Sequence, residues 1–480
     1  MKWWDKLWKG EKASMDNIYN LNGRVPLWRS VPYGLQHILA MFVANLGPIF
    51  VVAGACGLNG VDTARLVQVA MIIAGIGTLV QLFPLWRVGS GLPIVMGISF
   101  TFVGVFCSIG DYPTIVGAVI IGGLVEGLLG LFAKYWRKII SPIVAASVVT
   151  AIGVSLLSIG ATSFGGGATQ LGILQSGLNG STFGNWQHWT LGSVTLLSCI
   201  LFNIFAKGHW KQLSVLFGLV VGYILALVLH FAVPSLNLMD FSAFSDMAVI
   251  SFPLIPTVAP KFDLGAIISV TMIFLVSATE TIGDTSALAE SALGRQATDK
   301  EIAGSLACDG LVSAISGGVG CLPVTSFSQN VGLVSMTKVV NRFTIATGAI
   351  IMILSGIFPV FGAVFATLPE AVLGGCTLMM FGMIVVSGLQ MVAKCGFTQR
   401  NITIASLSLS IGVGFTLVKE LFHAFPPIIV SIFADNCVAV AFVVAIVLNL
   451  VLPKDMETGK PKTETAPEPI QTDGCECEQN

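Results

Sequence analysis

Two carboxylates follow an apolar stretch near the middle of the chain. The run from 265 to 279 contains no charged residue, and Glu280 and Asp284 come next, four positions apart. At this spacing, both side chains lie on one face of a helix. About sixteen apolar residues rise roughly 24 Å as a helix, so Glu280 would lie at hydrocarbon depth. We expect it to bind a substrate or carry a proton, with Asp284 as a second candidate nearer the helix end.

Single polar residues inside two other apolar segments are further candidates. Gln36 and His37 interrupt the run "GLQHILAMF", and Asp309 is the sole charge of the segment around "CDGLVSA". The alternatives are a packed polar residue for His37 and a helix cap for Asp309. Glu280, Asp309 and His37 together would suit proton coupling, because ionisable residues within membranes often form proton relays.

A markedly polar stretch lies among these hydrophobic segments. It reads "LPVTSFSQNVGLVSMTK" over residues 322–338. Irregular backbone at membrane depth is tolerated only where protein or a water-filled cavity satisfies its polar groups. We therefore expect this stretch to face a binding site, and a re-entrant packing kink without a ligand is the alternative.

The composition shows what kind of molecule holds these groups. Of 480 residues, 54% are hydrophobic and 10% are charged, and the mean hydropathy is +0.87. Soluble domains carry about 25% charged residues, so the sequence predicts an all-α polytopic membrane protein with the lipid bilayer as its surroundings. The formal net charge of −1 gives no indication of a nucleic-acid partner, and we predict none.

Sequence motifs for other kinds of chemistry are not found. Eight of the ten cysteines lie in or beside apolar runs, and Cys475 and Cys477 form a CxC in the tail, whose role the sequence does not indicate. Their spacing is not that of a metal site, so we predict no metal and no cofactor. No Walker A motif or catalytic triad indicates an enzyme. The N-terminal "MKWWDKLWKGEK" lacks the apolar core of a cleavable signal peptide.

A spanning length of about 20 residues predicts fourteen membrane segments. They lie near 31–56, 65–86, 92–109, 113–134, 139–161, 189–206, 212–233, 264–288, 302–318, 326–337, 343–365, 368–393, 401–418 and 433–453. The third and tenth are too short or too interrupted to cross as plain helices. We expect short extended stretches followed by half-helices there.

The distribution of basic residues supports this count and gives an orientation. With a cytoplasmic N-terminus, every second loop should be basic. These loops carry Arg87; Lys134, Arg137 and Lys138; Lys207 and Lys211; Arg295 and Lys300; Lys338 and Arg342; Lys394 and Arg400. We therefore predict both termini in the cytoplasm, with a cytoplasmic N-terminal segment over 1–29, a membrane-spanning region over 30–453 and a disordered cytoplasmic tail over 454–480.

An internal repeat connects the two interrupted segments. "VGSGLPIVMGISF" near residue 90 matches "GVGCLPVTSFSQN" near 320, with 230 residues from Pro93 to Pro323. A second pair, at Pro142 and Pro369, is 227 residues apart. Seven segments per half is an odd number, so we expect two inverted seven-helix repeats. Interrupted helices at matching places in two inverted halves indicate a transporter's binding site.

These residues carry a resemblance to a known family. "QNVGLVSMTK" (residues 329–338) resembles the signature of the nucleobase–ascorbate transporters, also called nucleobase:cation symporter-2. The signature reads Gln, Glu or Pro, then Asn-x-Gly, four variable residues, Thr, and a basic residue or Gly. The pair at Gln36, the "GSGLP" run, the "ETIGD" block and "CDG" extend the similarity over about 30–453. It implies a core domain from spans 1–4 and 8–11, a gate domain from spans 5–7 and 12–14, and a homodimer through gate helices.

The resemblance also implies roles for individual residues. Glu280 and Gln329 would hydrogen-bond a base, and the backbone near Ser99 and Asn330 would complete the site. Phe100 and Phe327 would stack on the ligand or close the pocket. Asn330 would hold the loop, His37 would orient polar neighbours, and Asp309 would take part in proton coupling. Asp284 and Gln36 would support the site.

The substrate implied is an oxidised purine base, uric acid or xanthine or both, imported with protons by alternating access across the cell membrane. Uracil carriers tend to have Glu where this chain has Gln329. Xanthine-restricted relatives often have Asn where this chain has Ser99, and the smaller hydroxyl leaves room for the extra oxygen of urate. A uracil:proton symporter of the family and an anion exchanger of the same fold are the alternatives. An anion exchanger should show a cation at the substrate site.

Overall fold

The computed structural model describes residues 16–133, 141–177, 180–236, 238–241, 244, 250–253, 258–426, 429–434 and 436–453. The first 15 residues, the loop with Lys134, Arg137 and Lys138, and the predicted tail over 454–480, with Cys475 and Cys477, lie outside the described residues. The predictions for these segments remain predictions.

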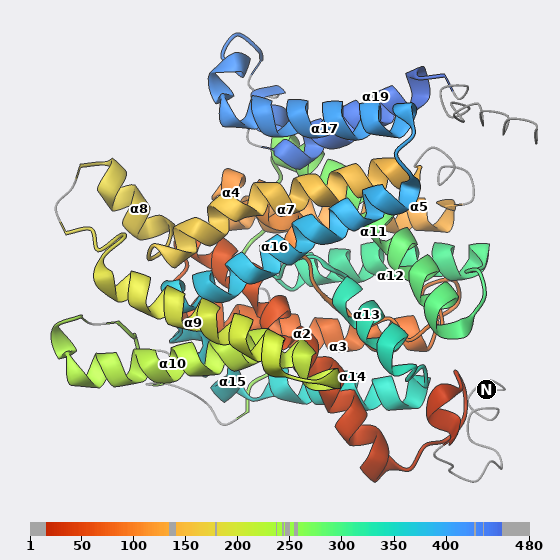
Figure 1. The fold of residues 1–480 in the computed structure, drawn as a ribbon, viewed down its shortest axis with the longest axis horizontal. Coiled ribbons are helices and arrows are strands. Elements are labelled where there is room, and N and C mark those ends of the chain that lie inside the picture. Colours follow the sequence, from red (N-terminus) through yellow and green to blue (C-terminus); the bar gives the residue numbers. More distant parts are fainter. Residues whose placement is uncertain are drawn as a thin grey trace, which may run out of the picture.

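Helices make up most of the described chain (Figure 1). In order they are α2 (Leu27–Ala55), α3 (Gly60–Leu82), α4 (Val103–Ile109), α5 (Tyr112–Leu131), α7 (Pro142–Phe164), α8 (Ala168–Gln175), α9 (Trp186–Phe205), α10 (Ser214–Ala232), α11 (Leu264–Leu293), α12 (Asp299–Gly318), α13 (Ser328–Thr337), α14 (Arg342–Ile357), α15 (Pro359–Ala366), α16 (Glu370–Cys395), α17 (Gln399–Leu417) and α19 (Cys437–Val451). Short 3-10 helices are η1 (Asp16–Tyr19), η2 (Phe100–Phe102), η3 (Gly208–Leu213), η4 (Pro234–Leu236) and η6 (Lys419–Phe422), and η7 (Val430–Ala434) is a π-helical turn.

Eight of the described helices are long and apolar enough to cross a membrane. A ninth span results if α14 and α15, which meet at an angle of 75°, are counted together. The sequence predicted one continuous segment over 343–365, but Pro359 follows the end of α14 and cannot continue its hydrogen-bond ladder. The all-helical, multi-pass prediction is confirmed at this level. The fourteen-span count and the inverted repeats stay predictions.

The helix that carries Glu280 is fixed at both ends by local chemistry. The side chain of Asp263 accepts a hydrogen bond from the backbone N–H of Ala266 at 2.8 Å, which caps the first turn of α11. At the other end of this 30-residue helix Gly294, with φ of 65°, ends it in the left-handed region that favours glycine. Thr298 and Glu301 then form a capping box that starts α12.

Helices far apart in sequence lie side by side. α7 runs along α16 (Figure 1), and these two helices form a first set with α17, which packs on α7, and α9, which packs on α16. A second set consists of α2, α3, α5, α11, α12 and α14. In it α14 packs on α2 and α3, α5 packs on α11 and α12, and α12 contacts α3. The assignment of these two sets to a gate and a core domain stays a prediction.

Glycines allow α5 and α12 to pack backbone against backbone. A Cβ at Gly310 of α12 would lie 2.1 Å from the backbone N of Gly127 in α5. A Cβ at Gly123 would lie 2.6 Å from the backbone N of Ala314. Small residues of this kind let membrane helices approach closely. The side chains that flank these glycines are therefore held at a tightly packed crossing.

Two short strands cross the interior of the helical bundle. β1 (Met96–Ile98) and β2 (Val324–Ser326) pair antiparallel, with Gly97 opposite Thr325. β1 falls in the third predicted segment, over 92–109, and β2 ends at Ser326, where the tenth predicted segment begins. β1 leads through η2 into α4, and β2 leads into α13.

Side chains of neighbouring helices hydrogen-bond the strands. The backbone N–H of Ile98 donates to Asn45 Oδ1 at 2.6 Å, and that of Met96 donates to Thr78 Oγ1 at 3.0 Å. The backbone N–H of Val324 donates to Ser313 Oγ at 3.1 Å. Because lipid offers no hydrogen bonds, buried strands need such partners. This requirement explains polar residues inside otherwise apolar helices.

Candidate functional site

The two carboxylates of α11 contact the segments that follow the two strands. Glu280 Oε2 accepts a hydrogen bond from the Thr101 hydroxyl at 2.8 Å, and Thr101 lies in η2, just after β1. Asp284 Oδ2 accepts from the hydroxyls of Ser326 and Ser328, each at 2.9 Å, at the end of β2 and the start of α13. One turn of α11 thus connects both interrupted segments.

Asp309 of α12 is fully buried and surrounded by donors. Its Oδ2 accepts from the Thr281 hydroxyl at 2.5 Å and from the backbone N–H of Ser326 at 2.9 Å. Its Oδ1 accepts from Gln81 Nε2 at 3.0 Å. The Gln81 side chain is itself oriented, because its Oε1 accepts from the backbone N–H of Ser90 at 3.0 Å. The helix-cap alternative therefore does not describe Asp309, which holds β2 in place.

Helix α13 places Gln329 and Asn330 in opposite environments. The side chain of Gln329 is exposed in the first turn of the helix, whereas Asn330 is buried. Asn330 Nδ2 donates to the backbone carbonyl of His37 at 3.2 Å, which ties α13 to α2. His37 Nδ1 and Gln36 Nε2 are buried nitrogens that lack a hydrogen-bond partner among the described residues. The contact between α2 and α13 thus contains Gln36, His37 and Asn330. The exposed amide of Gln329 is available to a ligand.

The candidates near β1 lie at the contact between the two helix sets. Ser99 caps η2, since its Oγ accepts from the backbone N–H of Thr101 at 3.2 Å. Phe100 packs edge-on against Phe381 of α16, with ring centroids 5.1 Å apart. Phe327 is also buried, and a Cβ at Gly97 would lie 2.9 Å from its ring. Phe100 therefore touches the other helix set, whereas Phe327 packs within its own.

Three polar residues of this region were not among the site residues predicted from the sequence. Thr101 and Gln81 carry no charge, and neither stands out in its segment. Glu126 did carry a signal, because it is the sole charged residue between Tyr112 and Ala133. It is 1% exposed, on the helix that crosses α12 at Gly310. A search for lone charges in every apolar segment would have found it.

The site is acidic. Its ionisable groups are the carboxyls of Glu280, Asp284, Asp309 and Glu126. The ion pairs described by the structure lie elsewhere, between Arg65 and Asp62, Lys261 and Asp111, and Arg295 and Glu301. In the described part of the chain, no cluster of three or more His, Cys, Asp or Glu residues could hold a metal ion.

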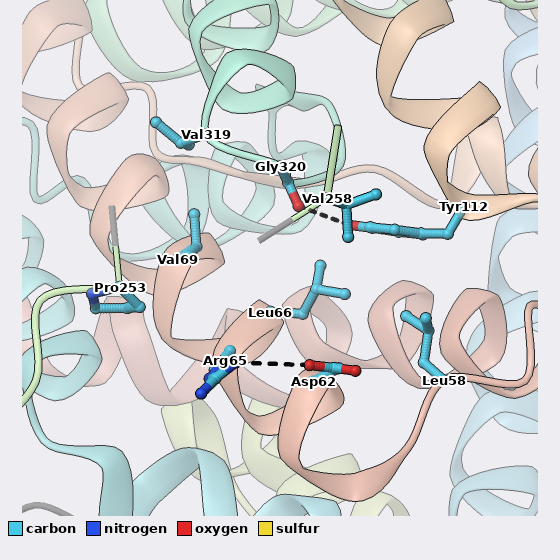
Figure 2. A pocket seen from close by; sticks show the side chains of 10 residues that line it. All are labelled: Leu58, Asp62, Arg65, Leu66, Val69, Tyr112, Pro253, Val258, Val319 and Gly320. Carbon is cyan, nitrogen blue, oxygen red and sulfur yellow. Dashed lines mark hydrogen bonds and ion pairs between the residues drawn. The ribbon is translucent and has the colours of Figure 1, made fainter. Parts of the chain in front are cut away.

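A pocket lies apart from these residues, where α3 and α5 begin and α12 ends (Figure 2). In Figure 2 the Tyr112 hydroxyl points at the carbonyl of Gly320, to which it donates at 2.8 Å. Arg65 and Asp62 form an exposed ion pair at 3.8 Å on another side of the pocket. None of the ten lining residues is a predicted substrate or coupling residue. We therefore place the candidate site at the strands and α11.

Comparisons with known proteins show which proteins the chain resembles. A model described as "Permease family" (Xan_ur_permease) matches residues 29–421. The xanthine permease XanQ of Escherichia coli (strain K12) is 32% identical over 456 residues, which cover 92% of this chain and 95% of that protein. The xanthine permease of Bacillus subtilis (strain 168) is 30% identical over 429 residues, covering 88% of this chain and 93% of that protein.

Solved structures show a related fold at low sequence identity. The murine Solute Carrier 26 family member A9 anion transporter, in its inward-facing state, superposes with a TM-score of 0.57 at 12% identity, covering 93% of this chain and 74% of that one. The transmembrane domain of a cyanobacterium bicarbonate transporter, BicA, gives 0.51 at 14% identity, covering 88% and 98%. These likenesses concern the fold alone.

Proposed function

The chain belongs to the nucleobase:cation symporter-2 permeases, and from this premise we propose that it imports an oxidised purine base, uric acid or xanthine or both, together with protons. It is a transporter and not an enzyme. The observation that carries the proposal is the meeting of Glu280 and Asp284 with the two segments that follow the paired strands. Both segments would change their contacts with α11 when a ligand enters.

The hydrogen-bonding groups at this place suit a purine dione. Such a base presents N–H and C=O groups side by side. Glu280 accepts hydrogen bonds, and Gln329 both donates and accepts them. The amide of Gln329 is exposed, so it is available to a ligand. Small-molecule sites generally combine an apolar slot with a few directed polar groups, and Phe100 and Phe327 would supply the apolar walls.

Proton coupling is proposed for the carboxyl groups near the site. Asp309 contacts β2 and Asp284 contacts Ser326. A change of charge at either carboxyl would therefore alter the hydrogen bonds of the segment that runs from β2 into α13, which we propose as a ligand segment. Alternating access would arise if the predicted core domain moved against the predicted gate domain. Phe100, which contacts Phe381 of α16, would lie at the boundary between these predicted domains.

Two alternatives give different expectations at the same site. An anion exchanger needs a cation near its ligand, and the charged groups described around the strands are carboxyls. In a uracil carrier, the base would present a different hydrogen-bonding edge to Gln329. The xanthine permeases among the relatives favour a purine, although that property belongs to those proteins.

Uptake of labelled xanthine by cells that express the chain tests the proposal. We expect saturable uptake that a protonophore abolishes and that removal of sodium leaves unchanged. Unlabelled xanthine and urate should compete strongly, and uracil, bicarbonate and sulfate weakly. Uptake that needs sodium but not a proton gradient would refute proton symport. Competition by uracil alone, or by anions alone, would refute the substrate class.

A further inference from the structure

Glu126 is a buried carboxyl for which the proposed transport cycle has so far no role. Glu126 is 1% exposed, and neither its Oε1 nor its Oε2 has a hydrogen-bond partner in the described part of the chain. It lies on α5 at the glycine crossing with α12, where a Cβ at Gly310 would lie 2.7 Å from the Glu126 backbone carbonyl carbon. Gly310 directly follows Asp309. The two carboxyl-bearing residues are thus brought together by backbone packing.

The surroundings of Glu126 and Asp309 favour opposite charge states. Asp309 accepts three hydrogen bonds, and two of their donors, Gln81 Nε2 and the Ser326 backbone N–H, cannot act as acceptors. This arrangement suits an ionised carboxylate. An ionised Glu126 would lack any such donor, and burying an unpaired charge is far more costly than burying a neutral acid. In this conformation the proton therefore belongs on Glu126.

The charged groups that act on Glu126 come from two helices packed against α5. Helix α12 contributes Asp309, and α11 contributes Glu280, and these two carboxyls act on Glu126 electrostatically. Asp284 lies one turn beyond Glu280 on α11. Helix α4 also packs on α5, and it carries no carboxyl or basic group. The buried hydroxyl of Ser277 on α11 also lacks a partner among the described residues.

The basic groups near α5 are engaged elsewhere. Lys261 pairs with Asp111, which precedes the first turn of α5, at 3.4 Å, far along the helix from Glu126. The charged side chains that act on Glu126 in the described part of the chain are the carboxyls of Asp309 and Glu280, and no basic side chain is among them.

We propose that Glu126 is a second proton-binding site that exchanges its proton with the cluster of Asp309 and Glu280 during transport. When the donors around Asp309 rearrange as β2 moves, Asp309 takes up a proton and Glu126 gives one up. One carboxyl becomes neutral as the other becomes charged, so the summed charge of Glu126 and Asp309 is conserved in the exchange. This inference rests on the proposed proton symport and adds a residue outside the ligand segments.

The test uses the purified full chain in liposomes. Glu126→Gln mimics the protonated acid but cannot release a proton, and Glu290→Gln, at an exposed position near the end of α11, is the matched control. Two quantities are measured: accumulation of labelled xanthine under an imposed proton gradient, and xanthine exchange without a gradient. We expect Glu126→Gln to lose gradient-driven accumulation while it keeps exchange. The control should keep both.

Several results would overturn the proposal. If Glu126→Gln accumulates xanthine like the wild type at every pH, Glu126 is a neutral packing group. If the variant loses exchange as well, it serves transport in general and not proton exchange. Should Glu126→Gln fail to reach the membrane, Glu126→Asp replaces it, and an unshifted pH dependence of its uptake would contradict the proposal. A wild type that ignores the proton gradient would instead refute the proposed symport.

Discussion

Replacing Asp309 with Asn should both destabilise the protein and stop transport. Asparagine keeps one acceptor oxygen and puts an NH₂ group in the place of the other. If this NH₂ replaces Oδ1, it meets Gln81 Nε2, which is also a donor. Gln81 cannot simply turn over, because its Oε1 holds the backbone N–H of Ser90. If the NH₂ replaces Oδ2 instead, it meets the backbone N–H of Ser326.

The loss of unfolding free energy in Asp309→Asn follows from these donors. In either orientation at least one hydrogen bond to a charged acceptor is lost, worth about 1.5–3 kcal/mol, and a buried donor is left unpaired at about 1–3 kcal/mol. The expected loss of unfolding free energy is therefore about 2.5–6 kcal/mol. Because Ser326 ends β2 and also contacts Asp284, the displaced strand should no longer present the ligand segment correctly.

Denaturant unfolding of the purified protein and xanthine uptake at matched membrane levels measure the two effects. Asp299→Asn is the control, since it makes the same chemical change at an exposed position in the first turn of the same helix. It should cost no more than about 1 kcal/mol, the usual value for an acidic residue at a helix start. If Asp309→Asn is as stable as the wild type and takes up xanthine equally well, the role given to this hydrogen-bond network is refuted.

Three further changes probe the ligand segments. Gln329→Glu should weaken xanthine and urate competition selectively, because an ionised carboxylate cannot donate to a carbonyl; an unchanged ranking of xanthine, urate, uracil and hypoxanthine would show that Gln329 does not read the ligand. Thr101→Val removes the hydroxyl that donates to Glu280 and should alter the KM for xanthine more than Thr101→Ser does, so equal KM values in both variants would contradict this role. Gly97→Ala places a Cβ 2.9 Å from Asn45 Oδ1, which accepts from the Ile98 N–H, and 2.9 Å from the Phe327 ring, so it should lower thermal stability. Gly104→Ala meets nothing within 4 Å and should not, and equal melting temperatures would contradict the tight packing of β1.

The sequence predicted the chemically prominent residues because charge in an apolar segment is visible without a structure. Glu280, Asp284 and Asp309 each interrupt a hydrophobic run, and periodicity places the first two on one helix face. Their partners were not predictable in this way. The hydrogen bond between Gln81 and Asp309 joins residues 228 positions apart, and that between Thr101 and Glu280 joins residues 179 apart. Uncharged side chains reveal such roles only once the helices are packed.

The fold shows the same division between local and distant information. Helices with strong apolar runs were predicted, and α11 and α12 are bounded by capping residues that the sequence displays. The break between α14 and α15 was missed although Pro359 marked it, because hydropathy alone continued through the proline. The pairing of β1 with β2 depends on side chains from α2, α3 and α12, and no local pattern specifies that contact.

Direct binding of xanthine and urate to the purified protein, wild type and Glu280→Gln, tests the central claim most directly. A carboxylate accepts N–H bonds from a base, whereas the amide brings a donor to a donor, which leaves a buried group unpaired at about 1–3 kcal/mol. We therefore predict saturable binding of both purines to the wild type and an affinity roughly one to two decades lower in the variant. Equal affinity in both proteins, or no saturable purine binding to the wild type, would contradict the claim that Glu280 holds an oxidised purine.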